Sequence, residues 1–291
     1  MRCSRVLLKT IKLQQNIMPE GPEIRLAADA LAAVLNDQIV EEIEFGQAPL
    51  KKYESELAGQ TISRVTNHGK AMLTHFENGI SIYSHNQLYG VWKIVRRGQL
   101  PRTKRSLRLA LHTTTHSALL YSASDISVWP TENLVEHPFL KKLGPDVLDA
   151  ELRWPLLRDR LLSARFSARS LAALYLDQSY LAGIGNYLRS EILFVAKVNP
   201  WQKPSVIGKS AAGRLAKASI NISTQSYRTK GITNTLKREK ALKSAGYRFE
   251  DRRFLVFNRE SLPCYTCHQT IVNTPVGSRR LYWCPSCQAP V

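Results

Sequence analysis

Near the start of this sequence, apolar residues recur three and four positions apart. The pattern begins after Pro19-Glu20-Gly21-Pro22-Glu23 and runs through Ile24, Ala27, Ala28, Leu31, Val34 and Leu35. This spacing places one apolar stripe along a helix, so it predicts an amphipathic helix. Pro22 suits the first turn of that helix, and Glu23 is favourable beside its positive end.

Segments that alternate between apolar and polar residues follow the helix and are typical of strands. An Asn78-Gly79 pair, which favours a tight hairpin turn, separates two of them. We predict strands at 61–66, 71–76, 80–84, 107–112 and 118–121. Residues from 19 to about 150 therefore read as a mostly antiparallel β-domain with one long helix at its start.

The second half of the chain has a mainly helical pattern. Helices are predicted at 161–180, 186–198 and 210–222. A Gly183-Ile184-Gly185 break separates the first from the second. The stretch from Thr224 to Arg253 is polar and basic, and we interpret it as a mobile loop or a solvated face. Phe254 to Phe257 then begins a C-terminal ribbon.

Four cysteines in this ribbon form the sharpest chemical motif of the sequence. Cys264 and Cys267 make one Cys-x-x-Cys pair, and Cys284 and Cys287 make a second. Four thiolates at this spacing suit tetrahedral zinc in a closed, structural site, whereas free or disulfide-bonded cysteines fit the spacing poorly. A ribbon this small has almost no core, so we expect one structural Zn²⁺ to be needed for its folding.

The charge balance points to a polyanionic partner. Lys and Arg total 41 against 23 Asp and Glu, a formal net charge of +18. Nucleic acid is the expected partner, and a generically basic protein is the alternative. No apolar run reaches the length of a membrane span. The only other cysteine is Cys3, so no disulfide framework is expected and a reducing cytosol fits.

The first seventeen residues form a basic leader. They contain Arg2, Arg5, Lys9 and Lys12 and no acidic residue. Their apolar stretch is too short and interrupted for a secretory signal, but an organellar presequence remains open. We favour an upstream start codon or a cloning leader, with Met18 as the true start. Removal of Met18 would then leave Pro19 at the N-terminus.

Several motifs occur in an order that matches a known family. They are the Pro-Glu-Gly-Pro-Glu start, Gly69-Lys70, the Gly183-Ile184-Gly185-Asn186 break and the terminal four-cysteine ribbon. From Pro19 to the C-terminus, the chain resembles the formamidopyrimidine-DNA glycosylase and endonuclease VIII family of base-excision repair enzymes. Segments 84–90, 121–125 and 137–140 are most similar to the bacterial endonuclease VIII branch.

The resemblance implies an α+β multidomain fold. Residues 1–18 would be a leader or a mis-assigned start, and 19–150 a catalytic antiparallel β-sandwich with a leading helix. Residues 151–253 would form a helix-two-turns-helix DNA-binding domain, and 254–291 the zinc ribbon.

The resemblance also implies four catalytic residues. Pro19 would be the nucleophile, because the secondary amine of an N-terminal proline can attack C1′ of a sugar and form an iminium ion. Glu20 would be the general acid that protonates the deoxyribose ring oxygen, a task that requires a raised pKa. Lys70 would contact the phosphate of the damaged nucleotide and assist elimination. Arg279 would grip the flanking phosphates, although its neighbour Arg280 leaves a one-residue ambiguity.

Five further residues are expected to contact DNA. Asn186 follows the two-glycine turn and opens a helix, where a phosphate can bind, although an ordinary helix cap is the alternative. Gln87-Leu88-Tyr89 matches the wedge that fills the gap left by a flipped base. Lys142 stands where the family tends to have a phosphate-contacting arginine. That departure keeps the charge but weakens the case for a bidentate contact.

Together these expectations describe a bifunctional DNA glycosylase and apurinic/apyrimidinic (AP) lyase. It would remove oxidised pyrimidines from damaged double-stranded DNA by β- and δ-elimination, as a monomer in the bacterial cytoplasm, associated with the nucleoid. Excision of 8-oxoguanine and formamidopyrimidine lesions is the first alternative. A non-catalytic zinc protein that binds nucleic acid is the second, and it applies if Pro19 is not the N-terminus.

Overall fold

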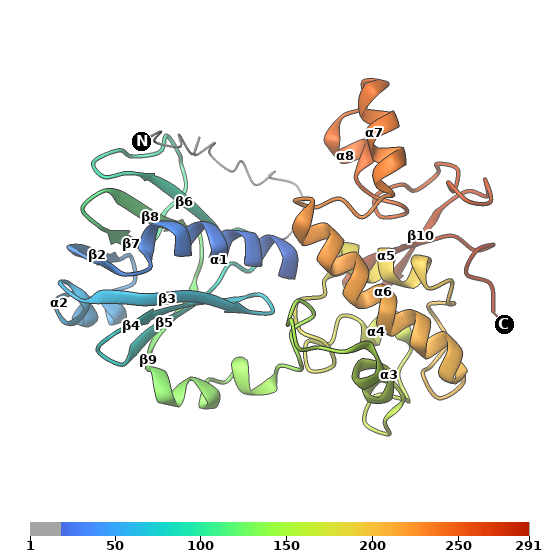
Figure 1. The fold of residues 1–291 in the computed structure, drawn as a ribbon, viewed down its shortest axis with the longest axis horizontal. Helices are drawn as coiled ribbons and strands as arrows, with labels where there is room; N and C mark the ends of the chain where they lie inside the picture. The colour runs from blue at the N-terminus through green and yellow to red at the C-terminus, as the bar shows by residue number, and fades with distance from the viewer. Residues whose placement is uncertain (1–18, 291) are drawn as a thin grey trace, which may run out of the picture. The chain divides into compact units, whose positions relative to one another are not determined.

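The computed structural model describes residues 19–290, which form two compact units (Figure 1). Of the described residues, the first unit comprises Pro19, 29–66 and 73–131. The second comprises 20–28, 67–72 and 132–290. Two short segments from the N-terminal half, one with Glu20 and one with Lys70, therefore belong to the second unit. The predicted leader, with Cys3, lies outside the described residues.

The first unit is built on two antiparallel sheets. The five-stranded sheet has the order β1-β3-β4-β5-β9, and the four-stranded sheet has the order β2-β7-β8-β6. The strands of the first sheet are β1 (Gln38–Ile39), β3 (Thr61–His68), β4 (Ala71–Phe76), β5 (Ile80–His85) and β9 (Asp125–Pro130). Those of the second are β2 (Glu42–Phe45), β6 (Val91–Arg96), β7 (Leu107–His112) and β8 (His116–Tyr121).

The predicted helix and strands of this half are confirmed. Helix α1 spans Gly21–Leu35, and Ile24, Leu31 and Leu35 are buried on its apolar face. A 3-10 helix, η1 (Ala48–Tyr53), and a short helix, α2 (Glu54–Leu57), were not predicted, nor were the strands β1, β2, β6 and β9. Of these strands, β1 and β2, with two and four residues, are too short to show a period.

The second unit is mainly helical and ends in a β-hairpin. Its 3-10 helices are η2 (Thr131–Glu136) and η3 (Leu140–Lys142). Its α-helices are α3 (Trp154–Leu162), α4 (Leu171–Leu174), α5 (Asn186–Val195), α6 (Gly208–Arg228), α7 (Leu236–Ser244) and α8 (Phe249–Arg252). The hairpin pairs β10 (Val272–Val276) with β11 (Arg279–Trp283).

One prediction for this half is wrong, and a second holds for only one of its two interpretations. The helix predicted over 161–180 is two short helices, because Ser170 starts α4 by accepting a hydrogen bond from the N–H of Ala173, and Asp177 accepts one from Ser179 in a turn. The stretch 224–253 is not a mobile loop but contains the end of α6 and helices α7 and α8, and the exposed α7 agrees with the alternative interpretation, a solvated face. Thr235 caps α7, and an ion pair between Glu239 and Arg252 joins α7 to α8.

A buried carboxylate connects the helices to the C-terminal ribbon. Glu191 of α5 accepts hydrogen bonds from the N–H groups of Leu255, Val256 and Phe257, each at 2.8 Å. Its side chain also accepts one from the Thr233 hydroxyl. These bonds satisfy a charge that would otherwise be costly to bury, and they hold the segment that leads into the ribbon.

Candidate active site

Glu20 lies in the second unit at the N-terminus of α5. Its side chain is almost fully buried, with 2% exposed, and its carboxylate accepts hydrogen bonds from the N–H groups of Gly185 (2.8 Å), Tyr187 (2.8 Å) and Leu188 (3.2 Å). Burial raises the pKa of Glu20 to about 7, although the charge of Lys70 opposes the rise. A carboxyl with this pKa can donate a proton near neutral pH.

Glycine is required where the turn before α5 approaches Glu20. A Cβ on Gly185 would lie 2.3 Å from the carboxyl carbon of Glu20, far inside normal contact. Gly183 has a φ of +95°, and its carbonyl accepts a hydrogen bond from the N–H of Gly21 at 2.8 Å. The two glycines of the predicted break thus allow the start of α1 to lie directly against the turn.

A second buried carboxylate, Glu23, supports this arrangement. It accepts a hydrogen bond from the backbone N–H of Glu20 at 3.1 Å and from the Tyr187 hydroxyl at 3.0 Å. Nη2 of Arg253 lies 3.7 Å from Oε1 of Glu23. Burial raises the pKa of Glu23, and Arg253 opposes that rise. Glu23 therefore orients the backbone on which Glu20 is mounted.

Among the charged groups, Lys70 has the largest effect on the pKa of Glu20. Its Nζ donates a hydrogen bond to the carbonyl of Ile184 at 2.8 Å. Burial lowers the pKa of Lys70, Glu20 opposes the change, and Arg279 adds to it. The preceding Gly69 has a φ of +56°, and its N–H is held by Asp146 at 2.7 Å. This turn directs the Lys70 amine to the loop before α5.

Asn186, the first residue of α5, is fixed by two hydrogen bonds. Its Nδ2 donates to the carbonyl of Arg280 at 2.8 Å, and its Oδ1 accepts from Nη2 of Arg189 at 2.5 Å. Arginine carries only donors, so the oxygen of the amide must face Arg189 and the nitrogen must face away. Burial lowers the pKa of Arg189 to about 10.

The hairpin separates the two arginines that the sequence left ambiguous. Arg279 is half-buried and Arg280 is exposed. The charge of Arg279 lowers the pKa of both Lys70 and Arg189, so its guanidinium acts on the same group of residues. Arg280 contributes its backbone carbonyl to Asn186.

The four ribbon cysteines converge on one point. All four Sγ atoms lie within 4.8 Å of one another. Cys264 and Cys287 are 3.9 Å apart and Cys267 and Cys284 are 3.4 Å apart, measured between Sγ atoms. Thiolates bound tetrahedrally to zinc at about 2.3 Å stand about 3.8 Å apart. The side chains therefore fit a structural zinc ion, as predicted.

Comparison with known proteins identifies the family. Residues 18–124 match the N-terminal domain of formamidopyrimidine-DNA glycosylase, and residues 143–238 match its helix-two-turns-helix domain. Endonuclease 8 of Salmonella arizonae is 46% identical over 93% of this chain and 100% of its own length. Endonuclease 8 of Salmonella agona is 45% identical with the same coverage. The chain belongs to the formamidopyrimidine-DNA glycosylase and endonuclease VIII family.

Solved structures show the same fold at lower identity. Formamidopyrimidine-DNA glycosylase of Lactococcus lactis, bound to DNA with an AP site, superposes with a TM-score of 0.76 at 20% identity. The match covers 93% of this chain and 99% of that one. A complex of the same enzyme with DNA containing an oxidised pyrimidine gives 0.78 at 21% identity, over 93% and 100% of the two chains.

Family membership confirms the predicted fold class, with two antiparallel sheets after a helix, a helix-two-turns-helix domain and a four-cysteine hairpin. The chain is an endonuclease VIII-type DNA glycosylase and AP lyase of this family. Across residues 19–290, no helix is long and apolar enough to cross a membrane.

The remaining expected site residues lie outside the Glu20 cluster. Lys142 is exposed at the end of η3 in the second unit. Leu88 and Tyr89 are 56% and 69% exposed on a loop of the first unit. Gln87 starts that loop with a φ of +50°, and its side chain accepts a hydrogen bond from Ser124 at 2.9 Å. Two apolar side chains are thus held out on an anchored turn, an arrangement suited to insertion into a stack.

Three residues that build the site were not predicted from the sequence. Tyr187 and Arg253 hold Glu23, and Arg189 holds Asn186. Arg253 belongs to a stretch interpreted as solvated, yet it is buried. Tyr187 and Arg189 follow the predicted Asn186 in the same helix, which is mostly apolar, and an arginine within such a helix was the one available signal in the sequence.

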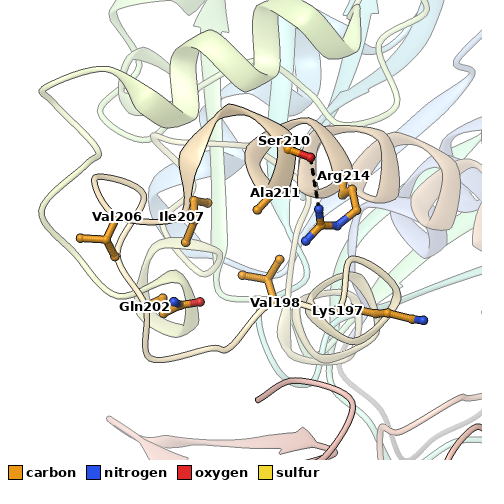
Figure 2. A pocket seen from close by; sticks show the side chains of 8 residues that line it. All are labelled: Lys197, Val198, Gln202, Val206, Ile207, Ser210, Ala211 and Arg214. Atoms are coloured by element: carbon orange, nitrogen blue, oxygen red, sulfur yellow. Dashed lines mark hydrogen bonds between the residues drawn. The ribbon is translucent and has the colours of Figure 1, made fainter. Parts of the chain in front are cut away.

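A separate pocket in the second unit contains none of the predicted site residues (Figure 2). It lies beside the start of α6, where the side chain of Arg214 donates to Ser210 at 3.4 Å. Val198, Val206 and Ile207 supply an apolar part of its lining. It is therefore distinct from the cluster around Glu20.

Proposed function

We propose that this enzyme removes oxidised pyrimidines from damaged double-stranded DNA and then cleaves the strand at the resulting abasic site. The observation that carries the proposal is the buried Glu20, whose pKa is about 7 and which directly follows Pro19. An amine nucleophile beside a carboxylic acid that is protonated near neutral pH is the pair that this chemistry needs. The choice of pyrimidines rests on the resemblance to the endonuclease VIII branch, to which the 46% identity with endonuclease 8 of Salmonella arizonae adds support.

In the proposed reaction, the lone pair of the Pro19 nitrogen forms a bond to C1′, and the damaged base departs with the electron pair of its broken bond and takes up the proton that the Pro19 nitrogen releases. Glu20 gives its proton to the deoxyribose ring oxygen, which opens the sugar and leaves an iminium ion between Pro19 and C1′. β-Elimination then expels the 3′ phosphate, and δ-elimination expels the 5′ phosphate. Because a secondary amine forms an iminium without losing a second N–H, proline suits this role.

The cations around Glu20 are proposed to bind the phosphates of the damaged strand. Lys70 and Arg279 influence one another electrostatically, and both surround the N-terminus of α5, where backbone N–H groups favour an anion. The amide nitrogen of Asn186 donates to the carbonyl of Arg280 beside the same turn, and its second N–H group is the proposed phosphate donor. We propose that Lys142 adds a further phosphate contact. Arg279, rather than Arg280, would be the gripping residue.

The exposed loop of the first unit is proposed to act on the duplex itself. Gln87, Leu88 and Tyr89 would fill the gap left by the flipped nucleotide, offsetting part of the few kcal/mol that unstacking costs. The protein would act as a monomer in the bacterial cytoplasm, associated with the nucleoid. We retain 19–150, 151–253 and 254–291 as the proposed catalytic, DNA-binding and ribbon domains.

Excision from matched duplexes tests this function. One duplex carries an oxidised pyrimidine, a second 8-oxoguanine and a third a formamidopyrimidine, with the same flanking sequence in each. The proposal predicts the fastest single-turnover excision from the first and its loss in Glu20→Gln. Faster release of 8-oxoguanine would favour the alternative specificity. Binding to all three without excision, by protein that begins at Pro19, would favour a non-catalytic role.

A further inference from the structure

The basic stretch before the ribbon forms a structured arm. We call residues 233–253, which contain α7 and α8, the α7 arm (Figure 1). The N–H groups of Thr233 and Asn234 both donate to the carbonyl of Arg253 at 2.9 Å, which closes the base of the arm. The side chain of Asn234 donates to the carbonyl of Arg252 at 2.9 Å. The arm is therefore an anchored projection of the second unit.

One face of α7 presents positive charge to solvent. Lys237, Lys240 and Lys243 are exposed, whereas Arg238 and Glu239 are half-buried. Leu236 is 55% exposed and Tyr247, just beyond the helix, is 54% exposed. At 100° per residue, the three lysines and Leu236 share one broad face of α7, and Tyr247 follows beyond the end of the helix. We call this face the lysine face.

The acidic residues of the arm do not neutralise the lysine face. Glu239 pairs with Arg252, Asp251 with Arg248, and Glu250 lies 3.6 Å from Arg253. Among residues 19–290, no ion pair involves any of the three lysines. Lysines three positions apart on a helix repel one another by a few tenths of a kcal/mol per pair. The face is thus unfavourable by itself and complementary to a polyanion.

The base of the arm joins the two parts of the second unit that are proposed to hold DNA. Arg253 lies beside Glu23, which supports Glu20. Arg238 stacks over the ring of Tyr265, next to the first ribbon cysteine, with its guanidinium 4.4 Å from the ring centre. The arm therefore adjoins both the residues that support Glu20 and the cysteine ribbon.

We propose that the lysine face of the α7 arm binds the sugar-phosphate backbone of duplex DNA outside the lesion. This inference rests on the proposed function for its ligand, but it concerns affinity and not chemistry. The three ammonium groups contact phosphates, and Leu236 and Tyr247 contact the sugars beside them. Such contacts carry no base information, so they strengthen binding without changing which lesion is excised.

The test compares two variants that lose the same charge. The arm variant is Lys237→Gln/Lys240→Gln/Lys243→Gln, and the control is Lys51→Gln/Lys52→Gln/Lys104→Gln, which removes three exposed lysines of the first unit. Binding to an undamaged duplex is measured between about 50 and 200 mM salt. Each lost phosphate contact lowers the salt slope by about 0.9, so the arm variant should lose up to about 2.7. The control should keep the wild-type slope.

The result that overturns the proposal is a wild-type salt slope in the arm variant while circular dichroism shows the helices intact. Poly-glutamate binding separates the rival partner: if the arm variant loses only that binding, the face recognises an acidic protein and the proposal is wrong. Excision is measured separately at saturating enzyme, where the arm variant should match the wild type. If no protein, the wild type included, excises a lesion but the arm variant still has a smaller salt slope than the wild type, the proposed function is wrong and the arm proposal stands.

Discussion

Replacing Gly185 by alanine should remove the chemistry of Glu20 while leaving the fold. The added Cβ would lie 2.3 Å from the carboxyl carbon of Glu20 and 2.4 Å from Oε1. Normal carbon contacts begin near 3.5 Å, so the carboxyl group must move by about 1 Å. The φ of Gly185 is −130°, which alanine adopts without strain, so the effect is steric.

The size of the defect follows from the displacement. A misplacement of about 1 Å costs on the order of 10²-fold in rate, and a general acid contributes about 10²–10⁴-fold. Base excision by Gly185→Ala should therefore fall by roughly 10²–10³-fold, and overpacking should cost about 1–3 kcal/mol of stability. Cleavage of a pre-formed abasic site, where no base departs, should be affected less.

A second glycine in the same unit provides the control. A Cβ on Gly213 of α6 would meet its nearest neighbour, a ring carbon of Trp154, at 3.7 Å, an ordinary contact. Gly213→Ala should therefore keep wild-type excision and gain up to about 1 kcal/mol in helix stability. Single-turnover excision and thermal unfolding measure both variants. Excision by Gly185→Ala within about threefold of wild type would refute the steric reasoning.

Three further predictions concern protonation, zinc and amide orientation. Because the pKa of Glu20 is raised to about 7, its carboxyl is protonated below that pH, and excision should fall as pH rises through about 7; a flat profile between about pH 6 and 8 would contradict a general acid. Cys284→Ser should lose zinc by elemental analysis and lose DNA binding, while the strands of the first unit persist by circular dichroism. If zinc stays at one ion per chain, the four-thiolate site is wrong. Arg189→Met should weaken DNA binding in the wild-type background but not in Asn186→Ala, because Arg189 acts by turning the Asn186 amide; additive effects in the double variant would show that Arg189 acts otherwise.

The regular parts of the fold were predictable because their signal is local. Helix α1 and strands β4 and β7 follow directly from the spacing of apolar residues in the sequence. Helix α7 was missed because its helical state does not depend on an apolar face. No residue of α7 is buried, and the helix is held by the cap from Thr235 and by the ion pair to Arg252. The cap is local and the ion pair depends on how α8 packs against α7, and neither contact leaves an apolar period in the sequence.

The site was predictable at its motifs and not at its supports. Glu20, Asn186 and the cysteines occur in short motifs whose residue types the chemistry requires. Tyr187 and Arg253 serve the site by reaching Glu23 across 164 and 230 positions of sequence, and no local pattern records such a contact. The pKa of Glu20 likewise depends on its burial under the α5 turn, which the residue type alone does not reveal.

Borohydride trapping on damaged DNA tests the central claim, that the Pro19 nitrogen is the nucleophile, most directly. Borohydride reduces an iminium ion to a stable amine, so an attacking amine becomes covalently joined to DNA. Protein that begins at Pro19 should be trapped, and peptide mapping should place the adduct on that residue. The 291-residue chain with its leader intact by mass should not be trapped, because an amide nitrogen is not nucleophilic. Equal trapping of the two forms would contradict the account and would make Lys70 the first residue to examine.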